Sequence, residues 1–291
     1  MNPLDLVRLT PLMDRTRGRP QVKIGLIDGP VHTSHPELSR DHIQEIGGNM
    51  LGACNSIACH HATFIAGILC AKRGSLAPAI CPDCTLVTRP IFTETALTDG
   101  QIPSATPEEL ATAIIECVAS GAQLINLSLA VSQPSHAGER QLKESLDFAA
   151  MRGVIIVAAS GNHATVGSSM LTRHQCVIPV VAYDLQARPM NYSNLAKTTG
   201  SRGLGAPGDS VTSLGPERES LTFGGTSVAT PFLTGALALL WSEFPNSTAA
   251  ELKMAIRSPY AAKRPSIVPP LLDAWRAYQF LVTTHTRRSA A

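Results

Sequence analysis

Apolar segments of two kinds alternate along most of this 291-residue chain. Short runs rich in Val, Ile and Leu predict buried strands, and longer segments with apolar residues at helical spacing predict helices. We expect strands at residues 22–27, 85–91, 123–127, 153–158 and 177–182, and helices at 61–71, 107–120, 139–151 and 227–243. Because strands that alternate with helices pair in parallel, the order predicts an α/β fold with a mostly parallel sheet and helices on both faces.

The last predicted helix begins with a serine that follows two glycines, in the sequence Gly224-Gly225-Thr226-Ser227. The start of a buried helix offers unpaired N–H groups and the positive end of the helix dipole, which favour a hydroxyl that attacks a substrate. A serine before a helix is often only an N-cap, and that alternative stays open for the segment alone. Capping explains the serine but not the paired glycines, which permit a close backbone approach.

A serine nucleophile needs a base that removes its proton and an acid that orients this base. The first predicted strand would deliver Asp28 to its C-terminal end, the edge where catalytic groups of parallel sheets gather. His61 stands at the beginning of a predicted amphipathic helix. For Asp28 alone, a helix-capping or turn residue stays open as the alternative. A metal site at His60 and His61 is disfavoured, because adjacent residues on a helix point in different directions.

Five ordered segments resemble the motifs of the subtilisin family of serine proteases. They are Leu26–Asp28 with Ser34–Leu38 for the aspartate, His61–Gly67 for the histidine, Leu124–Ala130 for the substrate strand, Val157–Asn162 for the oxyanion asparagine and Gly225–Pro231 for the serine. The order Asp, His, Ser is also that of subtilisin. The resemblance implies a subtilisin-like three-layer fold, with residues 1–281 as a single catalytic domain. The sequence of residues 282–291 itself predicts a disordered tail. The resemblance also implies a serine endopeptidase that works through an acyl-enzyme.

The resemblance assigns a role to each matching residue. Ser227 would be the nucleophile, His61 the general base and then acid, and Asp28 the group that orients the imidazole. The side-chain amide of Asn162 would donate to the oxyanion. Six residues would bind the substrate as a strand or line its pocket: Ser128, Leu129, Ala130, His163, Ser169 and Met170. No metal and no other cofactor is implied.

Several residues depart from the family pattern and indicate a specialised protease. Gly29 follows the aspartate where the family usually has Ser or Thr, so a hydroxyl that would support Asp28 is missing. Ala130 replaces a pocket glycine. The segment Leu26–Val31, with His35-Pro36 after it, is similar to the cyanobactin maturation proteases, which act on ribosomal precursor peptides. Macrocyclising members carry a helical cap between aspartate and histidine, and residues 29–60 are too few for one, so hydrolysis is predicted.

Two alternative functions stay open. The chain is either a subtilisin-like protease of broad specificity or a catalytically inactive homologue that only binds a peptide strand. Charged residues nearly balance, with 24 Lys and Arg against 22 Asp and Glu, so we expect neither a nucleic-acid nor a membrane partner. The first residues lack the apolar stretch of a secretory signal, and no inhibitory segment precedes Asp28, which predicts a cytoplasmic enzyme. The sequence does not indicate the oligomeric state.

Seven cysteines have no role in this protease pattern. Cys54, Cys59, Cys81 and Cys84 are open to three interpretations: free thiols, one or two disulfides, or a zinc site. A module built on Cys81 and Cys84, with vestigial protease motifs, is a further alternative. A cytoplasmic location argues against stable disulfides. The other three, Cys70, Cys117 and Cys176, are predicted to lie in the core.

Overall fold

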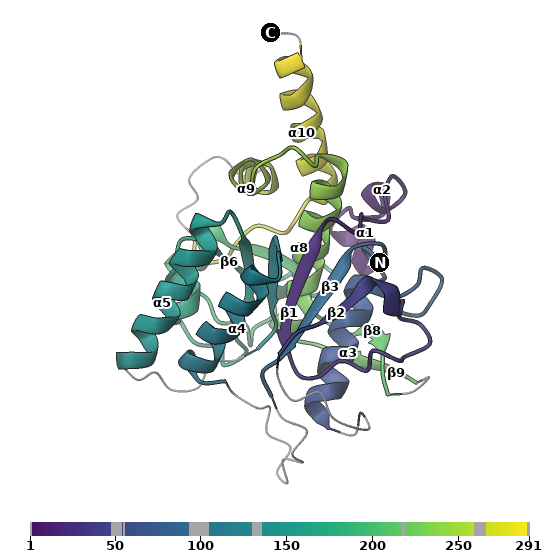
Figure 1. Ribbon diagram of the computed structural model, residues 1–291. Helices are drawn as coiled ribbons and strands as arrows, with labels where there is room; N and C mark the ends of the chain where they lie inside the picture. Colours follow the sequence, from purple (N-terminus) through teal and green to yellow (C-terminus); the bar gives the residue numbers. More distant parts are fainter. Residues whose placement is uncertain are drawn as a thin grey trace.

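A seven-stranded parallel sheet forms the centre of the computed structural model, which describes residues 2–47, 54, 56–92, 105–129, 136–216, 219–258 and 266–289. The strand order is β2-β3-β1-β4-β5-β6-β7. The strands are β1 (Lys23–Asp28), β2 (Ile43–Glu45), β3 (Thr85–Pro90), β4 (Leu124–Leu127), β5 (Ile155–Ala159), β6 (Val177–Tyr183) and β7 (Leu204–Pro207). An antiparallel pair, β8 (Val211–Leu214) and β9 (Ser220–Phe223), lies outside this sheet. The predicted parallel α/β fold is confirmed (Figure 1).

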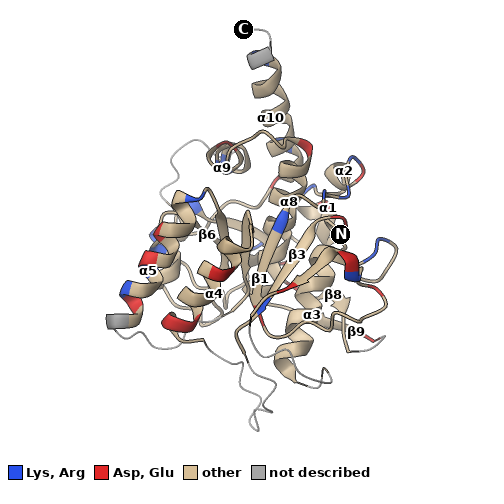
Figure 2. Ribbon diagram, viewed as in Figure 1, with Lys and Arg blue, Asp and Glu red and all other residues tan. Residues whose placement is uncertain are grey.

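Helices cover both faces of the sheet (Figure 1). They are α1 (Pro3–Leu6), α2 (Thr10–Met13), α3 (Ile57–Cys70), α4 (Pro107–Ala119), α5 (His136–Met151), α6 (Met170–Arg173), α7 (Lys197–Arg202), α8 (Thr226–Glu243), α9 (Ala249–Arg257) and α10 (Ala274–Ser289), with a 3₁₀ turn at Arg40–His42. On one face, α3 and α8 pack against each other, and α8 also contacts β4 to β7. On the other face, α4 and α5 pack together, and α5 carries both acidic and basic residues (Figure 2).

The two faces of the sheet bury two separate apolar clusters. Along β1, Ile24 and Leu26 belong to the cluster around α3 and α8, whereas Ile27 belongs to the cluster around α4. This alternation follows from the pleat of a strand, in which successive side chains point to opposite faces. Because both faces are buried, the strands are continuous apolar runs, which is why they could be predicted from the sequence.

Two expectations about the helices need correction. Helix α3 begins at Ile57, four residues earlier than predicted, so His61 lies in its second turn and not at its start. Ser56 is the reason, because its hydroxyl accepts the N–H of Cys59 and caps the helix. Helix α10 continues to Ser289, so residues 282–289 are helical instead of a frayed tail. Among the helices of the described ranges, none has the length and apolar character needed to cross a bilayer.

Arg73 ties the N-terminal segment to the loop after α3. Its guanidinium donates hydrogen bonds to the carbonyl oxygens of Met13 at 2.5 Å, Thr16 at 2.7 Å and Ile80 at 3.1 Å. These carbonyls come from two chain segments that lie far apart in the sequence, so one cation holds them together. Hydrogen bonds to a charged donor are among the stronger ones in proteins.

We expect Arg73→Met to lower the free energy of unfolding by about 2 kcal/mol, because it leaves three carbonyls without their charged donor. Urea unfolding followed by circular dichroism measures this change. The matched control is Lys72→Met, which removes the neighbouring exposed cation and its single bond to the Pro36 carbonyl. Equal losses of unfolding free energy in the two variants would contradict a special role of the three Arg73 hydrogen bonds.

Candidate active site

The carboxyl end of β1 holds a buried aspartate next to a histidine. Asp28 is 1% exposed, and its Oδ1 accepts a hydrogen bond from His61 Nδ1 at 2.9 Å and from the Gly29 N–H at 2.8 Å. A carboxylate can only accept, so the Nδ1 of His61 carries the proton and its Nε2 is left as the basic nitrogen. The structure thus joins the two residues that the sequence predicted as orienting acid and base.

The packing of α3 explains why residue 29, which follows Asp28, is a glycine and carries no hydroxyl. A Cβ at this position would lie 2.2 Å from the carbonyl oxygen of Ala58, which belongs to the first turn of α3. Only glycine therefore lets α3 pack this closely against the end of β1. Asp28 Oδ2 is buried and has no hydrogen-bond partner among the described residues. The close helix approach has taken the space that a supporting hydroxyl would need.

Two opposing effects act on the pKa of His61. Burial lowers it, while the charge of Asp28 and the hydrogen bond to Asp28 raise it, and the net shift is upward from 6.5. The protonated imidazole is therefore favoured over a larger pH range than in a free histidine. A base that accepts a proton must be neutral, so activity that depends on His61 falls as the pH drops through this raised pKa.

We expect the acid limb of the pH profile to have its midpoint above pH 6.5, since the pKa of His61 is raised. Asp28→Asn removes the charge that causes the upward shift, so its acid limb should lie at lower pH. The second-order rate of inactivation by a fluorophosphonate, measured from pH 5 to 9, tests both statements. An acid limb that does not move in Asp28→Asn would show that another group controls it.

Ser227 is the second residue of α8 and is half-buried. The N-cap of this helix is Gly225, which makes no side-chain cap, so the interpretation of Ser227 as an N-cap is wrong. Gly225 has φ +131°, a conformation that other residues rarely adopt. Its N–H donates to the Gly208 carbonyl at 2.8 Å, which fixes the turn before the serine.

A proline in α8 and a buried hydroxyl together fix the backbone of Ser227. Pro231 has no N–H, so the Ser227 carbonyl four residues earlier lacks its helical partner. Ser128 Oγ, at the end of β4, donates to this carbonyl at 2.8 Å. Ser128 in turn accepts from Asn126 Nδ2 at 2.9 Å, and Asn126 Oδ1 accepts from the Thr234 hydroxyl at 2.8 Å.

The amide nitrogen of Asn162 lies beside Gly225, two residues before Ser227. Its Oδ1 accepts two hydrogen bonds from Thr226, one from the N–H and one from the hydroxyl, both at 2.9 Å. Both donors meet the same oxygen, so the NH₂ group is on the other side. A Cβ built on Gly225 would lie 3.1 Å from Asn162 Nδ2 and 3.5 Å from Ser227 Oγ. The two groups therefore face one small space, which the absence of a side chain on Gly225 leaves open.

The other predicted site residues follow β4 and β5 in the chain. Leu129 is buried directly after Ser128, and His163 is exposed directly after Asn162. Ser169 caps α6, since its hydroxyl accepts the N–H of Thr172. Met170 is partly buried against the cluster around α4 and α5. Ala130 lies outside the described residues.

Sequence reasoning missed three residues that position the site: Thr226, Asn126 and Thr234. Thr226 holds the oxygen of Asn162, and its hydroxyl also accepts the N–H of Gly161 at 3.2 Å. Asn126 and Thr234 form the buried link to Ser128. Their signal was present in the sequence, because a polar residue inside an apolar strand or helix needs a buried partner.

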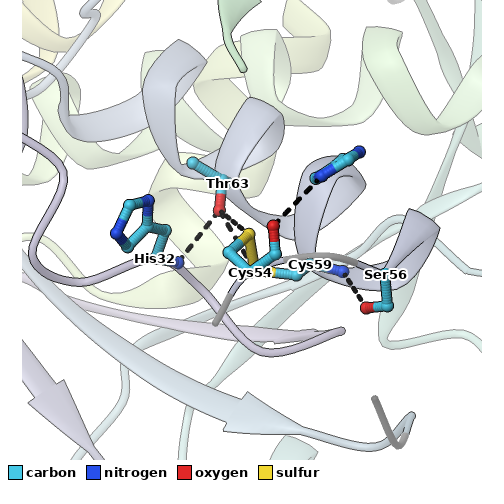
Figure 3. The surroundings of a disulfide bond; sticks show 6 residues. His32, Cys54, Ser56, Cys59 and Thr63 are labelled. Carbon is cyan, nitrogen blue, oxygen red and sulfur yellow. Dashed lines mark hydrogen bonds between the residues drawn. A yellow bond between two sulfur atoms is a disulfide. The ribbon is translucent and has the colours of Figure 1, made fainter. Parts of the chain in front are cut away.

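Two of the cysteines form a disulfide beside the histidine helix (Figure 3). Cys54 pairs with Cys59, which lies in the first turn of α3, and both sulfurs lie 3.9 Å from the hydroxyl of Thr63. Of the alternatives left open, the structure selects a disulfide for this pair and free buried thiols for Cys81 and Cys84. Within the described ranges, no three His, Cys, Asp or Glu residues are grouped as metal ligands.

The three cysteines predicted to be buried core residues, Cys70, Cys117 and Cys176, are indeed free and buried. Cys176 also belongs to an Asp-His-Cys arrangement away from the site. His174 contacts Asp147 Oδ1 at 3.0 Å and the Cys176 sulfur at 3.0 Å. Burial raises the pKa of the Cys176 thiol to about 11. The thiol is 2% exposed, so this cluster lacks both the thiolate and the access that a nucleophile needs.

Known sequences that are similar to this chain are subtilisin-like proteases. The sequence model of the Subtilase family matches residues 19–266. Subtilisin DY of Bacillus licheniformis is 27% identical over 245 residues, which cover 81% of this chain and 82% of that protein. Subtilisin E of Bacillus subtilis is 26% identical, and the match covers 81% of this chain and 60% of that protein.

Solved structures with the same fold include several maturation proteases. The prenylagaramide maturation protease PagA has a TM-score of 0.80 and 26% identity, and the match covers 94% of this chain and 98% of that one. The patellamide maturation protease PatG has a TM-score of 0.81 at 19% identity, with 97% and 99% covered. A lanthipeptide protease has a TM-score of 0.76 at 19% identity, with 96% and 92% covered. Below 25% identity, such similarity establishes the fold alone.

Proposed function

Because this chain belongs to the subtilase family of serine endopeptidases, we propose that it cleaves peptide bonds with Ser227, His61 and Asp28 and that it matures a precursor peptide. One observation carries the assignment of these residues. Asn162 Nδ2 and Ser227 Oγ both lie within 3.5 Å of the point where Gly225 lacks a Cβ. A carbonyl carbon next to the serine would place its oxygen beside the amide, as acyl transfer requires.

In the proposed mechanism, Ser227 Oγ attacks the carbonyl carbon of the peptide bond while His61 Nε2 takes the hydroxyl proton. Asp28 stabilises the imidazolium that forms, through the 2.9 Å contact with Nδ1. The Asn162 amide and the backbone N–H of Ser227, at the start of α8, bind the negative oxygen. His61 then donates its proton to the leaving amine, which yields the acyl-enzyme. A water molecule, deprotonated by His61, hydrolyses the ester and restores Ser227.

One comparison supports cleavage of a precursor peptide. The maturation protease PagA, at 26% identity, shares the fold over 94% of this chain. We propose that Ser128, Leu129 and Ala130, which follow β4, pair with the substrate backbone, because an extended segment binds an extended peptide through main-chain hydrogen bonds. Selectivity then comes from side chains that contact the substrate, for which we propose His163, Ser169 and Met170. Apolar pockets discriminate weakly, by about 1–3 kcal/mol per methylene, so several subsites are needed.

We further propose hydrolysis and not macrocyclisation, because only residues 29–56 separate β1 from α3, and β2 lies among them, which leaves little chain for a separate cap. The cytoplasmic location stays a prediction. The Cys54–Cys59 disulfide argues against it, since stable disulfides are rare in the cytosol.

Digestion of two substrates tests the proposed selectivity. Unstructured casein should be cut slowly, while a library of extended peptides, read by mass spectrometry, should show cleavage at one defined sequence. Ser227→Ala is the control for contaminating proteases. Rapid cutting of casein at many sites would favour the broad-specificity alternative. No cleavage of either substrate, together with no labelling by a fluorophosphonate, would favour the inactive peptide-binding alternative.

A further inference from the structure

The loop that carries Asn162 is exposed and needs hydrogen bonds to hold its shape. Residues 162–167 are all exposed, and Val166 is 77% exposed. Two residues of this loop, Gly161 and Ala164, have positive φ, +101° and +52°. Thr226 of α8 holds the side-chain oxygen of Asn162, but packing in the core does not hold the backbone of this loop. Hydrogen bonds to a neighbouring segment, residues 192–195, hold the loop backbone in place.

Asn194 contacts the chain on both sides of Asn162. Its side-chain Oδ1 accepts the N–H of His163 at 2.9 Å and the N–H of Thr165 at 3.1 Å. Its own backbone N–H donates to the Gly161 carbonyl at 2.9 Å. Its amide nitrogen lies 2.3 Å from where a Cβ of Gly161 would be, so the side chain packs directly over that glycine.

Backbone bonds between the two segments do not depend on the Asn194 side chain. Ala164 N–H donates to the Tyr192 carbonyl at 2.8 Å, Leu195 N–H to the Thr165 carbonyl at 2.9 Å, and Gly167 N–H to the Leu195 carbonyl at 2.9 Å. These bonds should keep the loop folded when the side chain is truncated. Truncation of the Asn194 side chain would specifically remove the oxygen that accepts the N–H groups of His163 and Thr165, and His163 directly follows Asn162.

We propose that Asn194 is a positioning residue, which holds the amide of Asn162 in place for the oxyanion by accepting the N–H groups of His163 and Thr165. The proposal rests on the proposed function, because it presumes that Asn162 binds the oxyanion. An oxyanion donor lowers the barrier only when it is already in place as charge develops, so a looser loop reduces the rate of the chemical step. Substrate binding before that step should change little.

The experiment measures covalent labelling of the full chain by a fluorophosphonate, in which Ser227 Oγ bonds to phosphorus and fluoride leaves. This reaction needs no knowledge of the natural peptide, and it separates the rate constant kinact from the binding constant KI. We expect Asn194→Ala to lower kinact about 10-fold with KI nearly unchanged. Asn194→Asp keeps an acceptor oxygen for both N–H groups and should label faster than Asn194→Ala. The matched control is Asn191→Ala, which changes an exposed asparagine of the same segment and should label like the wild type.

A double-mutant cycle distinguishes positioning from a general structural role. If Asn194 acts through Asn162, then Asn162→Ala with Asn194→Ala should label no more slowly than Asn162→Ala alone. Equal losses in both backgrounds would overturn the proposal, as would labelling of Asn194→Ala at the wild-type rate. Wild-type labelling of Asn162→Ala would instead remove the premise and overturn the proposed oxyanion role as well. Thermal unfolding of each variant confirms that it is folded.

Discussion

Ser227→Ala is expected to lower kcat by about 10⁶-fold and to abolish labelling by a fluorophosphonate. This magnitude comes from subtilisin itself, a member of the same family. The physical reason is that the hydroxyl is the atom that forms the acyl-enzyme, and the methyl group of alanine cannot replace it. The remaining site should still bind peptide, because Asn162, Thr226 and the backbone turn at Gly225 are unchanged.

The measurement compares labelling and peptide cleavage in the wild type, in Ser227→Ala and in Ser201→Ala. Ser201 is an exposed serine of α7 whose hydroxyl bonds only locally, to the Thr198 carbonyl, so its loss should change neither readout. Labelling that persists in folded Ser227→Ala would locate the nucleophile elsewhere in the chain. Identification of the labelled peptide by mass spectrometry would then name it.

Asn162→Ala is expected to lower kcat by about 10²- to 10³-fold, a range measured for the same kind of loss in subtilisin. KM should change little, because the amide binds charge that develops only in the transition state. Two hydrogen bonds from Thr226 hold the amide oxygen, so the NH₂ group is oriented before the substrate arrives. This preorganisation is the source of the expected effect.

Steady-state kinetics with the peptide found by library cleavage separates kcat from KM. Asn191→Ala, which removes an exposed amide outside the site, is the control. A variant in which KM rises while kcat is unchanged would make Asn162 a substrate-binding residue and not an oxyanion donor. The alanine variant should retain measurable activity, since Ser227, His61 and Asp28 are still present.

The aspartate motif illustrates where sequence reasoning reached its limit. The sequence showed that Gly29 lacks the hydroxyl usual in the family, but it could not show why. The reason is a contact between segments that are distant in the chain, because the Ala58 carbonyl occupies the space that a Cβ on Gly29 would need. Asp28 Oδ2, next to this contact in the chain, is buried and has no hydrogen-bond partner among the described residues. No local pattern encodes such an approach between a helix and a strand end.

The start of α3 and the cysteines illustrate the same limit. The spacing of apolar residues predicted that the helix begins at His61. The Ser56 cap starts the helix one turn earlier, in the segment that also contains the Cys54–Cys59 disulfide, and this turn has no apolar pattern that would reveal it. Cysteine spacing alone left disulfides, metal and free thiols open. Only the distance between the two sulfurs decides which cysteines pair, and distances across a loop depend on the folded chain.

The sequence by itself determined the parallel sheet, its helices on both faces, and the identity of the candidate acid, base and nucleophile. It could do so because the period of apolar residues and the short motifs around Asp28, His61 and Ser227 are local properties of the chain. The tertiary structure alone decided how these residues are held. Ser128 meets the Ser227 carbonyl, Thr226 holds Asn162, and Asn194 braces its loop, each across a gap of about 30 to 100 residues. Such pairings form only when the packed sheet and helices bring distant segments together, so their residues carry no local signal beyond being polar.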